Sequence, residues 1–512
     1  MPQHHSAGVQ LPFITSTGFA HRGGVNLVSR HTIRSIAGKY GKLSTIVPQQ
    51  KATEGTARAE YQVVKKKYTS KIKLNTWKHK SGRKKKAKEH EISENRSLLI
   101  LELDPANPLP ILSFPGTAAI LKFWHSEMIT NNFALNPDGD WYESIREDSA
   151  ALHAMISVVG SIQTLHRGNK EGINELRHQA EAVRLINRQL TSKDGYLSDG
   201  VIAAAAVLVN QEALGDSFFR ARVHMEGLAG MIEIRGGLEN MKCRVVLKRI
   251  ITYADFCFSS AWGQPLQFPT IRSLVSTCDT EGSDRFSDLR LKSAWSRGPR
   301  TSDLYGDIFD ALELLHSITC RIVEAPTRNY DKTKLSNSIY LVEHQLCRMN
   351  SASISAVEPR CLDLAAPLAA AAHLFLHLGV RNIPANARRH RFLFHRLYMS
   401  LPQNLTLGSL GEAPRAGVVL LLWVYAIGAV NEADHIAYGI YLIQIKQSCL
   451  VLGVRCYAEF KDCIKDVLWM DPFCEEHMMR IWHNAEGGVI IPAEIGGAIR
   501  KGSEFACSEV DY

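Results

Sequence analysis

The sequence predicts an all-α protein in which one large multi-helix domain follows a disordered, basic N-terminal tail. From Thr117 onward, apolar residues recur at three- and four-residue spacing, which is the period of an amphipathic helix. No two segments show the alternating pattern of a β-hairpin, and the Asp-Gly pairs lie between expected helices or at a helix start. Charge is also distributed unevenly along the chain, and this separates the tail from the domain.

The first 96 residues are polar, rich in Gly and Lys, and lack a regular apolar period, so we expect them to be mostly disordered. Residues 1–95 contain 19 Lys and Arg against 5 Asp and Glu, a net charge of +14. Because the whole chain carries +9, residues 96–512 carry −5. This asymmetry predicts an anionic partner for the tail and not for the domain.

We expect residues 97–487 to form the helical domain and residues 488–512 to form a C-terminal tail. Four prolines predict an extended linker over 96–115. Ser198 and Asp199 precede an Ala-rich run and predict a helix cap there, whereas the charged stretch 271–302 predicts a mobile loop. The apolar period predicts helices at 117–132, 144–164, 171–191, 198–213, 216–235, 241–262, 303–323, 332–349, 360–379, 385–400, 412–431, 434–453, 457–469 and 472–484.

The most informative segment is His224–Pro269. Its apolar residues predict a first helix that ends near Arg235, where a cation suits the helix dipole. Gly236 or Gly237 can adopt the left-handed conformation that ends a helix. A second apolar helix follows at 241–262 and is closed by prolines. From physical chemistry alone, this segment is a helix hairpin.

The same segment resembles the signature of the fungal-specific transcription factor domain family. Members have a helix that ends in Arg-Gly-Gly-Leu, a helix that carries Ala-Asp, and a Phe-Pro exit; many have Trp before Ala-Asp, where this chain has Tyr253. A looser likeness extends over residues 115–487, including Leu420–Val430 and Val467–Trp482. The resemblance implies a helical regulatory and dimerisation domain that acts in RNA polymerase II transcription, with structural roles for the signature residues. The matching residues are Arg235, Gly236, Gly237, Leu238, Ala254, Asp255, Phe268 and Pro269.

A basic tract lies in the tail, where residues 61–88 contain twelve Lys and Arg and no Asp or Glu. Such a cluster can bind the acidic groove of a nuclear import receptor, lie along DNA phosphates, or serve only as a solvated linker. No leucine heptad follows it, which argues against a basic leucine zipper. The candidate residues for import or phosphate contact are Lys65, Lys66, Lys67, Arg83, Lys84, Lys85, Lys86 and Lys88.

The cysteines and histidines predict no metal site and no cofactor. Many fungal transcription factors carry two tight trios of N-terminal cysteines that wrap zinc, but here none of the eleven cysteines precedes Cys243 and no two are closer than seven residues. The resemblance is therefore to family members that lack the zinc cluster. His373 and His377 are four residues apart on an expected helix, a spacing that can bind zinc, but their context is strongly apolar and has no Glu between them. We therefore interpret them as core or surface histidines. The cysteines expected to be reduced and buried are Cys257, Cys320, Cys347, Cys449, Cys456, Cys463 and Cys474.

No catalytic residue is predicted, because the chain has no nucleophile elbow and no phosphate-binding glycine loop. Asp255 is a lone carboxylate on an apolar helix. We expect it to form a hydrogen bond or an ion pair, for instance with Arg235 or Arg249, and a place in a ligand pocket is the alternative.

The tail and the resemblance together predict a nuclear transcription regulator that forms homo- or hetero-oligomers with other regulators and contacts DNA, if at all, through the tail. Two alternatives stay open: a nuclear co-regulator or scaffold that does not bind DNA, and a helical enzyme of secondary metabolism. The longest apolar run, Ala416–Val430, is 15 residues long and falls short of the ~20 that a membrane helix needs, so we expect a soluble protein.

Overall fold

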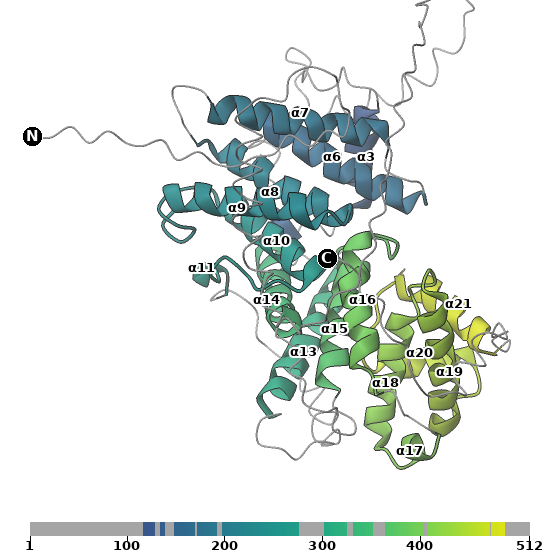
Figure 1. The fold of residues 1–512 in the computed structure, drawn as a ribbon. Helices are drawn as coiled ribbons and strands as arrows, with labels where there is room; N and C mark the ends of the chain where they lie inside the picture. Colours follow the sequence, from purple (N-terminus) through teal and green to yellow (C-terminus); the bar gives the residue numbers. More distant parts are fainter. Residues whose placement is uncertain are drawn as a thin grey trace, which may run out of the picture. The chain divides into compact units, whose positions relative to one another are not determined.

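The structure is a computed structural model, and it describes residues 116–128, 134–138, 148–168, 172–191, 197–275, 302–324, 331–351, 364–402, 407–471 and 473–486. Within these ranges the chain forms helices and no β-strand, which confirms the all-α prediction (Figure 1). The expected tails at 1–96 and 488–512, and residues 276–301 of the expected loop, lie outside the described residues.

Two of the helices before the loop begin at side-chain caps. Asp148 accepts hydrogen bonds from the backbone N–H groups of Ala150 and Ala151 at 2.9 and 3.0 Å. Ser198 accepts one from Val201 at 3.1 Å, which confirms the predicted cap. The helices of this part are α3 (Thr117–Glu127), α6 (Ser149–His166), α7 (Ile173–Leu190), α8 (Asp199–Leu214), α9 (Phe218–Ile234), α10 (Val245–Trp262) and α11 (Arg272–Val275).

The helices after the loop include one π-helical segment, η3 (Leu376–Val380), which continues α15 directly. One 3-10 segment, η4 (Arg388–His390), leads into α16. The α-helices of this part are α13 (Ser302–Glu324), α14 (Lys332–Ser351), α15 (Ala365–Phe375), α16 (Arg391–Ser400), α17 (Leu407–Gly411), α18 (Arg415–Gly428), α19 (His435–Leu452), α20 (Tyr457–Lys465) and α21 (Phe473–Glu486).

Every helix that the apolar period predicts has a counterpart, although the ends differ by several residues at some positions. The largest difference is at the expected helix 385–400, where α16 begins only at Arg391. Asn382 has a left-handed φ of 51°, which turns the chain after η3 and delays the next helix. The short helices α11 and α17 were not expected.

Each helix packs against neighbours that are close in sequence. α6 packs against α7 and α8, α8 against α9 and α10, and α15 against α16 and α18. α18 in turn packs against α19 and α20. α10 also packs against α14, and this contact joins the helices before the loop to those after it.

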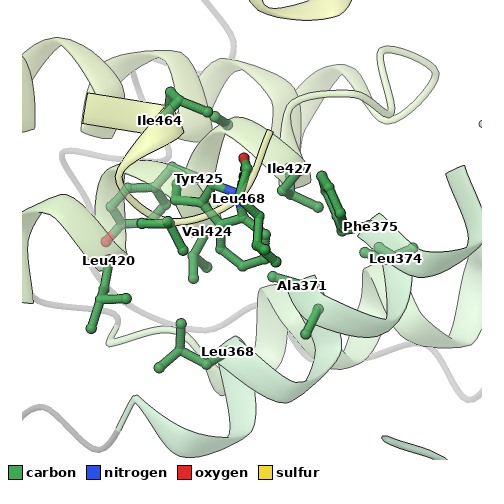
Figure 2. Close-up of a cluster of buried hydrophobic side chains, with 14 of the residues drawn as sticks. Leu368, Ala371, Leu374, Phe375, Leu420, Val424, Tyr425, Ile427, Ile464 and Leu468 are labelled. Carbon is green, nitrogen blue, oxygen red and sulfur yellow. Dashed lines mark hydrogen bonds between the residues drawn. The ribbon is translucent and has the colours of Figure 1, made fainter. Parts of the chain in front are cut away.

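The core of the second part is a continuous apolar cluster that α15 and α18 dominate. In Figure 2, Leu368 and Phe375 of α15 face Leu420 and Val424 of α18, with Ile464 of α20 beside them. Trp423 of α18 is 0% exposed, and its indole N–H donates a hydrogen bond to the backbone oxygen of Leu468 at 3.3 Å. The apolar run that the sequence marks as a core helix therefore lies in the core.

Length and apolar composition decide whether a helix in the described ranges could span a membrane. No single helix there is both long and apolar enough to cross a membrane, and α19 and α20 meet that condition only as a pair bent by 93°.

The described cysteines are free thiols, and most are buried as predicted: Cys257, Cys347, Cys449, Cys463 and Cys474. The prediction is wrong for Cys320 and Cys456, which are exposed. Cys456 is the residue before α20, so it lies at a helix start and not on the packed face that the seven-residue spacing suggested.

Candidate functional site

The Arg-Gly-Gly-Leu motif forms the end of α9. Gly236 and Gly237 have left-handed φ angles of 88° and 85°. The N–H of Gly237 donates to the carbonyl of Ile232 at 2.9 Å, and that of Gly236 donates to the carbonyl of Glu233 at 3.0 Å. This is the paired hydrogen bonding of a Schellman motif, which satisfies the last carbonyls of the helix. Both glycines therefore take the conformation that the sequence analysis allowed for either one.

Arg235 fastens this helix end to the start of α8. Its guanidinium donates to the backbone oxygen of Leu197 at 2.8 Å and to the carboxylate of Asp199 at 2.9 Å. A longer hydrogen bond of 3.5 Å reaches the carbonyl of Lys242, in the connection to α10. Leu238, the last residue of the motif, is 3% exposed and anchors that connection in the core.

Asp255 holds the segment that leaves α10. It is 1% exposed, and its carboxylate accepts hydrogen bonds from the backbone N–H groups of Gln267 and Phe268, each at 2.9 Å to Oδ2. Burial raises the pKa of Asp255 to about 7, although these two N–H donors act in the opposite direction. The hydrogen bond that we expected is present, but its partners are neither Arg235 nor Arg249.

The signature residues therefore have a common role as connectors between helices. Arg235 joins α8 to the connection between α9 and α10, and Asp255 joins α10 to the Phe268-Pro269 exit. Arg249, the other expected partner, instead hydrogen-bonds to the side-chain oxygen of Asn337 on α14. The structure does not bring Arg235 and Asp255 into one site with each other.

A second set of polar side chains lies where α10, α14, α15 and η4 meet, and none of it was predicted as a site. Arg381 forms a buried ion pair with Glu343, and its guanidinium carbon lies 4.5 Å from the centroid of the Tyr253 ring. Arg389 is 1% exposed and donates hydrogen bonds to Asn210 at 3.3 Å and to the Tyr253 hydroxyl at 3.5 Å. These contacts place two guanidinium groups and one carboxylate in the interior.

Three histidines belong to the same set. His373, His377 and His390 are each 0% exposed. Burial, together with the charge of Arg389, lowers the pKa of His373 and of His390 to about 3 and that of His377 well below its ordinary value. The three imidazoles are therefore neutral near pH 7. The ring centroids of His377 and His390 are 5.4 Å apart.

We call this set of residues the buried polar cluster: Asn210, Tyr253, Glu343, His373, His377, Arg381, Arg389 and His390. Its exposed fractions do not exceed 8%. Several close ionisable groups in one place are a feature of active sites. Here, however, the closed packing keeps solvent and substrates away from these side chains in this conformation.

The sequence predicts only part of this arrangement. It singled out His373 and His377 as core or surface histidines, and their burial places them in the core. It did not identify Glu343, Arg381 or Arg389, although a lone charged residue in an apolar stretch, as in Ser338–Cys347, is the kind of signal that reveals a buried charge. The candidate import residues from Lys65 to Lys88 lie outside the described residues.

Comparisons with known proteins add no family to these observations. No protein-family model matches the chain, and neither a curated protein nor a solved structure matches it. Its function is therefore inferred from the residues described above.

Proposed function

We propose that this chain is a nuclear transcription regulator that resembles the fungal-specific transcription factor domain family, in the class without a zinc cluster. The observation that carries the proposal is the order of the Arg-Gly-Gly-Leu, Ala-Asp and Phe-Pro motifs. Its support from geometry is that Arg235, Gly237 and Asp255 each fix a connection between helices. Residues that fix the connections between helices are needed for the fold itself, so proteins that share the fold would share them.

The domain is proposed to act as a regulatory and dimerisation module, and the tail to supply nuclear targeting. The tail carries +14 over residues 1–95 and the rest of the chain carries −5, so an acidic receptor or DNA would bind the tail and not the domain. Any DNA affinity of the tail rests on phosphate contacts, which release counterions, and it should therefore fall steeply with salt. Salt-resistant, sequence-specific binding by residues 1–95 would contradict this part of the proposal.

One specific feature favours a second candidate function, a nuclear co-regulator that reaches DNA only through a partner. No cysteine precedes Cys243, so the chain lacks the thiolates from which a zinc-cluster DNA-binding module is built. In that case residues 97–512 would capture a zinc-cluster factor and the tail would serve for import alone.

The test is genome-wide chromatin occupancy of the tagged full-length protein beside a version that lacks residues 61–88. Discrete peaks with a shared sequence motif support a DNA-directed regulator, acting itself or through a partner. A nuclear protein without peaks favours the co-regulator. A cytoplasmic full-length protein would contradict both and favour the enzyme or scaffold alternatives.

The import role has a sharper test with a matched control. We expect alanine at Arg83, Lys84, Lys85 and Lys86 to lower the nuclear-to-cytoplasmic ratio of the tagged protein several-fold. The control removes as many cations from the domain, at exposed arginines of α7 and at the one that follows α6, and should leave that ratio unchanged. The control positions are Arg167, Arg177, Arg184 and Arg188. Equal nuclear accumulation of the two variants would defeat the role given to the basic tract.

A further inference from the structure

Three potential metal ligands converge inside the buried polar cluster. Glu343 lies on α14, His373 on α15 and His377 on η3, and each of them is 0% exposed. One ligand atom from each lies within 4.8 Å of the other two. The two histidines are four residues apart, so they project from adjacent turns toward the same face of α14.

Two atoms of this group face each other without forming a hydrogen bond. Glu343 Oε1 and His377 Nε2 are 3.6 Å apart, and neither has a hydrogen-bond partner among the described residues. The separation is too long for a hydrogen bond. It is close to the distance of about 3.4 Å that two ligands of one tetrahedral ion keep when each metal–ligand bond is about 2.0–2.1 Å. An ion between them would satisfy both atoms.

We propose that Glu343, His373 and His377 bind a divalent transition-metal ion of the Zn²⁺ type between α14 and the α15–η3 helix. Neutral imidazole nitrogens and a carboxylate are ligands that Zn²⁺ accepts, whereas Mg²⁺ and Ca²⁺ prefer oxygen alone. The site needs no open cavity, because the ion occupies the space between its ligands. This inference does not depend on the proposed role in transcription.

Neighbouring side chains hold the ligands in place. Arg381 pairs with Oε2 of Glu343, which orients the carboxylate and leaves Oε1 for the ion. Asn350 contacts Nδ1 of His373 at 3.4 Å, and the other ring nitrogen, Nε2, lies 4.0 Å from Sγ of Cys347. Cys347 follows Glu343 by one helical turn and lies beside His373 at the edge of the ligand group.

The π-helical segment is independent support for a site at this position. η3 begins at Leu376 and carries His377, immediately after the regular α-helix that carries His373. A π-helical turn is rare, is poorer in energy than an α-helical one, and occurs frequently at functional sites. Here it carries His377, whose Nε2 faces Oε1 of Glu343.

The positive charges of the buried Arg381 and Arg389 oppose the binding of a cation. Arg381 is neutralised by Glu343, but Arg389 has only neutral hydrogen-bond partners among those observed, Asn210 and Tyr253. Because repulsion by Arg389 weakens binding, Arg389→Gln should tighten it, an effect that a purely structural arginine would not produce.

The experiment measures Zn²⁺ in the full-length protein after denaturation with a chelator, refolding in the presence of Zn²⁺ and exhaustive dialysis. We expect one Zn²⁺ per chain by mass spectrometry of the metal, and a thermal midpoint above that of protein refolded without Zn²⁺. His377→Gln keeps the side-chain volume, removes a ligand and should lose both effects. His390→Gln is the matched control, since His390 is equally buried and adjacent but lies outside the ligand group, and it should keep both.

A second measurement on the unaltered protein covers the case in which a variant fails to fold. Refolding of the wild type with Co²⁺ should give the visible absorption of Co²⁺ bound in a tetrahedral site. Zn²⁺ retained equally by the wild type and His377→Gln would be surface binding and would overturn the proposal. So would a wild-type protein that refolds fully in Zn²⁺ or Co²⁺ and retains neither ion.

Discussion

The carboxylate of Asp255 accepts a hydrogen bond from the backbone N–H of Phe268 at 2.9 Å, across the turn that ends α10. This contact joins the Ala-Asp and Phe-Pro motifs, since Asp255 and Phe268 are thirteen residues apart in sequence. It explains why a carboxylate is present on a helix that is otherwise apolar. Without it, the N–H groups at this turn would lose their acceptor.

Replacement of Asp255 by alanine should therefore destabilise the domain. Two partly buried N–H groups, those of Gln267 and Phe268, would lose their acceptor, at a cost of about 2–4 kcal/mol. Urea unfolding at pH 7 measures the change. Asp462→Ala, at an exposed position of α20, is the control and should shift the free energy of unfolding by no more than about 0.5 kcal/mol. Equal effects of the two substitutions would contradict the role given to Asp255.

Alanine should change the free energy of unfolding in opposite directions at two glycines, Gly237 after α9 and Gly439 inside α19. Gly237 has a φ of 85° and open space around the position of an added Cβ, so Gly237→Ala should cost about 1–2 kcal/mol through backbone strain alone. Gly439 also has open space but lies inside α19, so Gly439→Ala should stabilise the protein by about 0.5–1 kcal/mol. Denaturant unfolding of both variants checks this. A neutral or stabilising Gly237→Ala would show that the left-handed turn is not required.

Close packing of α18 against α19 predicts a different kind of glycine effect. A Cβ added at Gly428 would lie 2.7 Å from the ring of Tyr441, which is itself 2% exposed. The ring has to move into a packed core, and we expect Gly428→Ala to cost about 1–3 kcal/mol. A lower thermal midpoint for Gly428→Ala than for Gly439→Ala is the expected result. The reverse order would mean that these helices are farther apart than described.

Stability should fall in acid because histidines are buried in the neutral form. Burial and the charge of Arg220 lower the pKa of His224 from 6.5 to about 4. Between pH 4 and pH 6.5 the unfolded chain therefore binds about one more proton at His224 than the folded protein does. The stability that neutral His224 contributes is thus present above pH 6.5 and is lost as the pH falls toward 4. The slope for one such group is about 1.4 kcal/mol per pH unit.

Unfolding free energies at several pH values between 7.5 and 5 measure this slope. His224→Gln should reduce this slope by about 1.4 kcal/mol per pH unit, the contribution of one titrating group. The exposed His435→Gln serves as the control for loss of a histidine. Parallel profiles for the wild type and His224→Gln would show that His224 does not titrate in this way.

The sequence by itself determined the helical fold, most helix positions and the turn chemistry of the signature. These features depend on local properties: the apolar period, the cap at Ser198, and glycines that tolerate a positive φ. It also located the apolar run that became α18, because a helix without a polar face has to be buried. Its errors were local as well, since the seven-residue cysteine spacing did not reveal that α20 begins only after the exposed Cys456.

Only the tertiary structure decided which polar side chains meet. Glu343 and His377 are 34 positions apart in the sequence, and their 3.6 Å separation depends on how α14 packs against α15 and η3. The partner of Asp255 likewise depends on the path of the chain after Gly263, not on the charge of any nearby residue. Hydrogen bonds and ion pairs act over a few ångströms, so an amphipathic pattern fixes which face is buried but not what that face contacts.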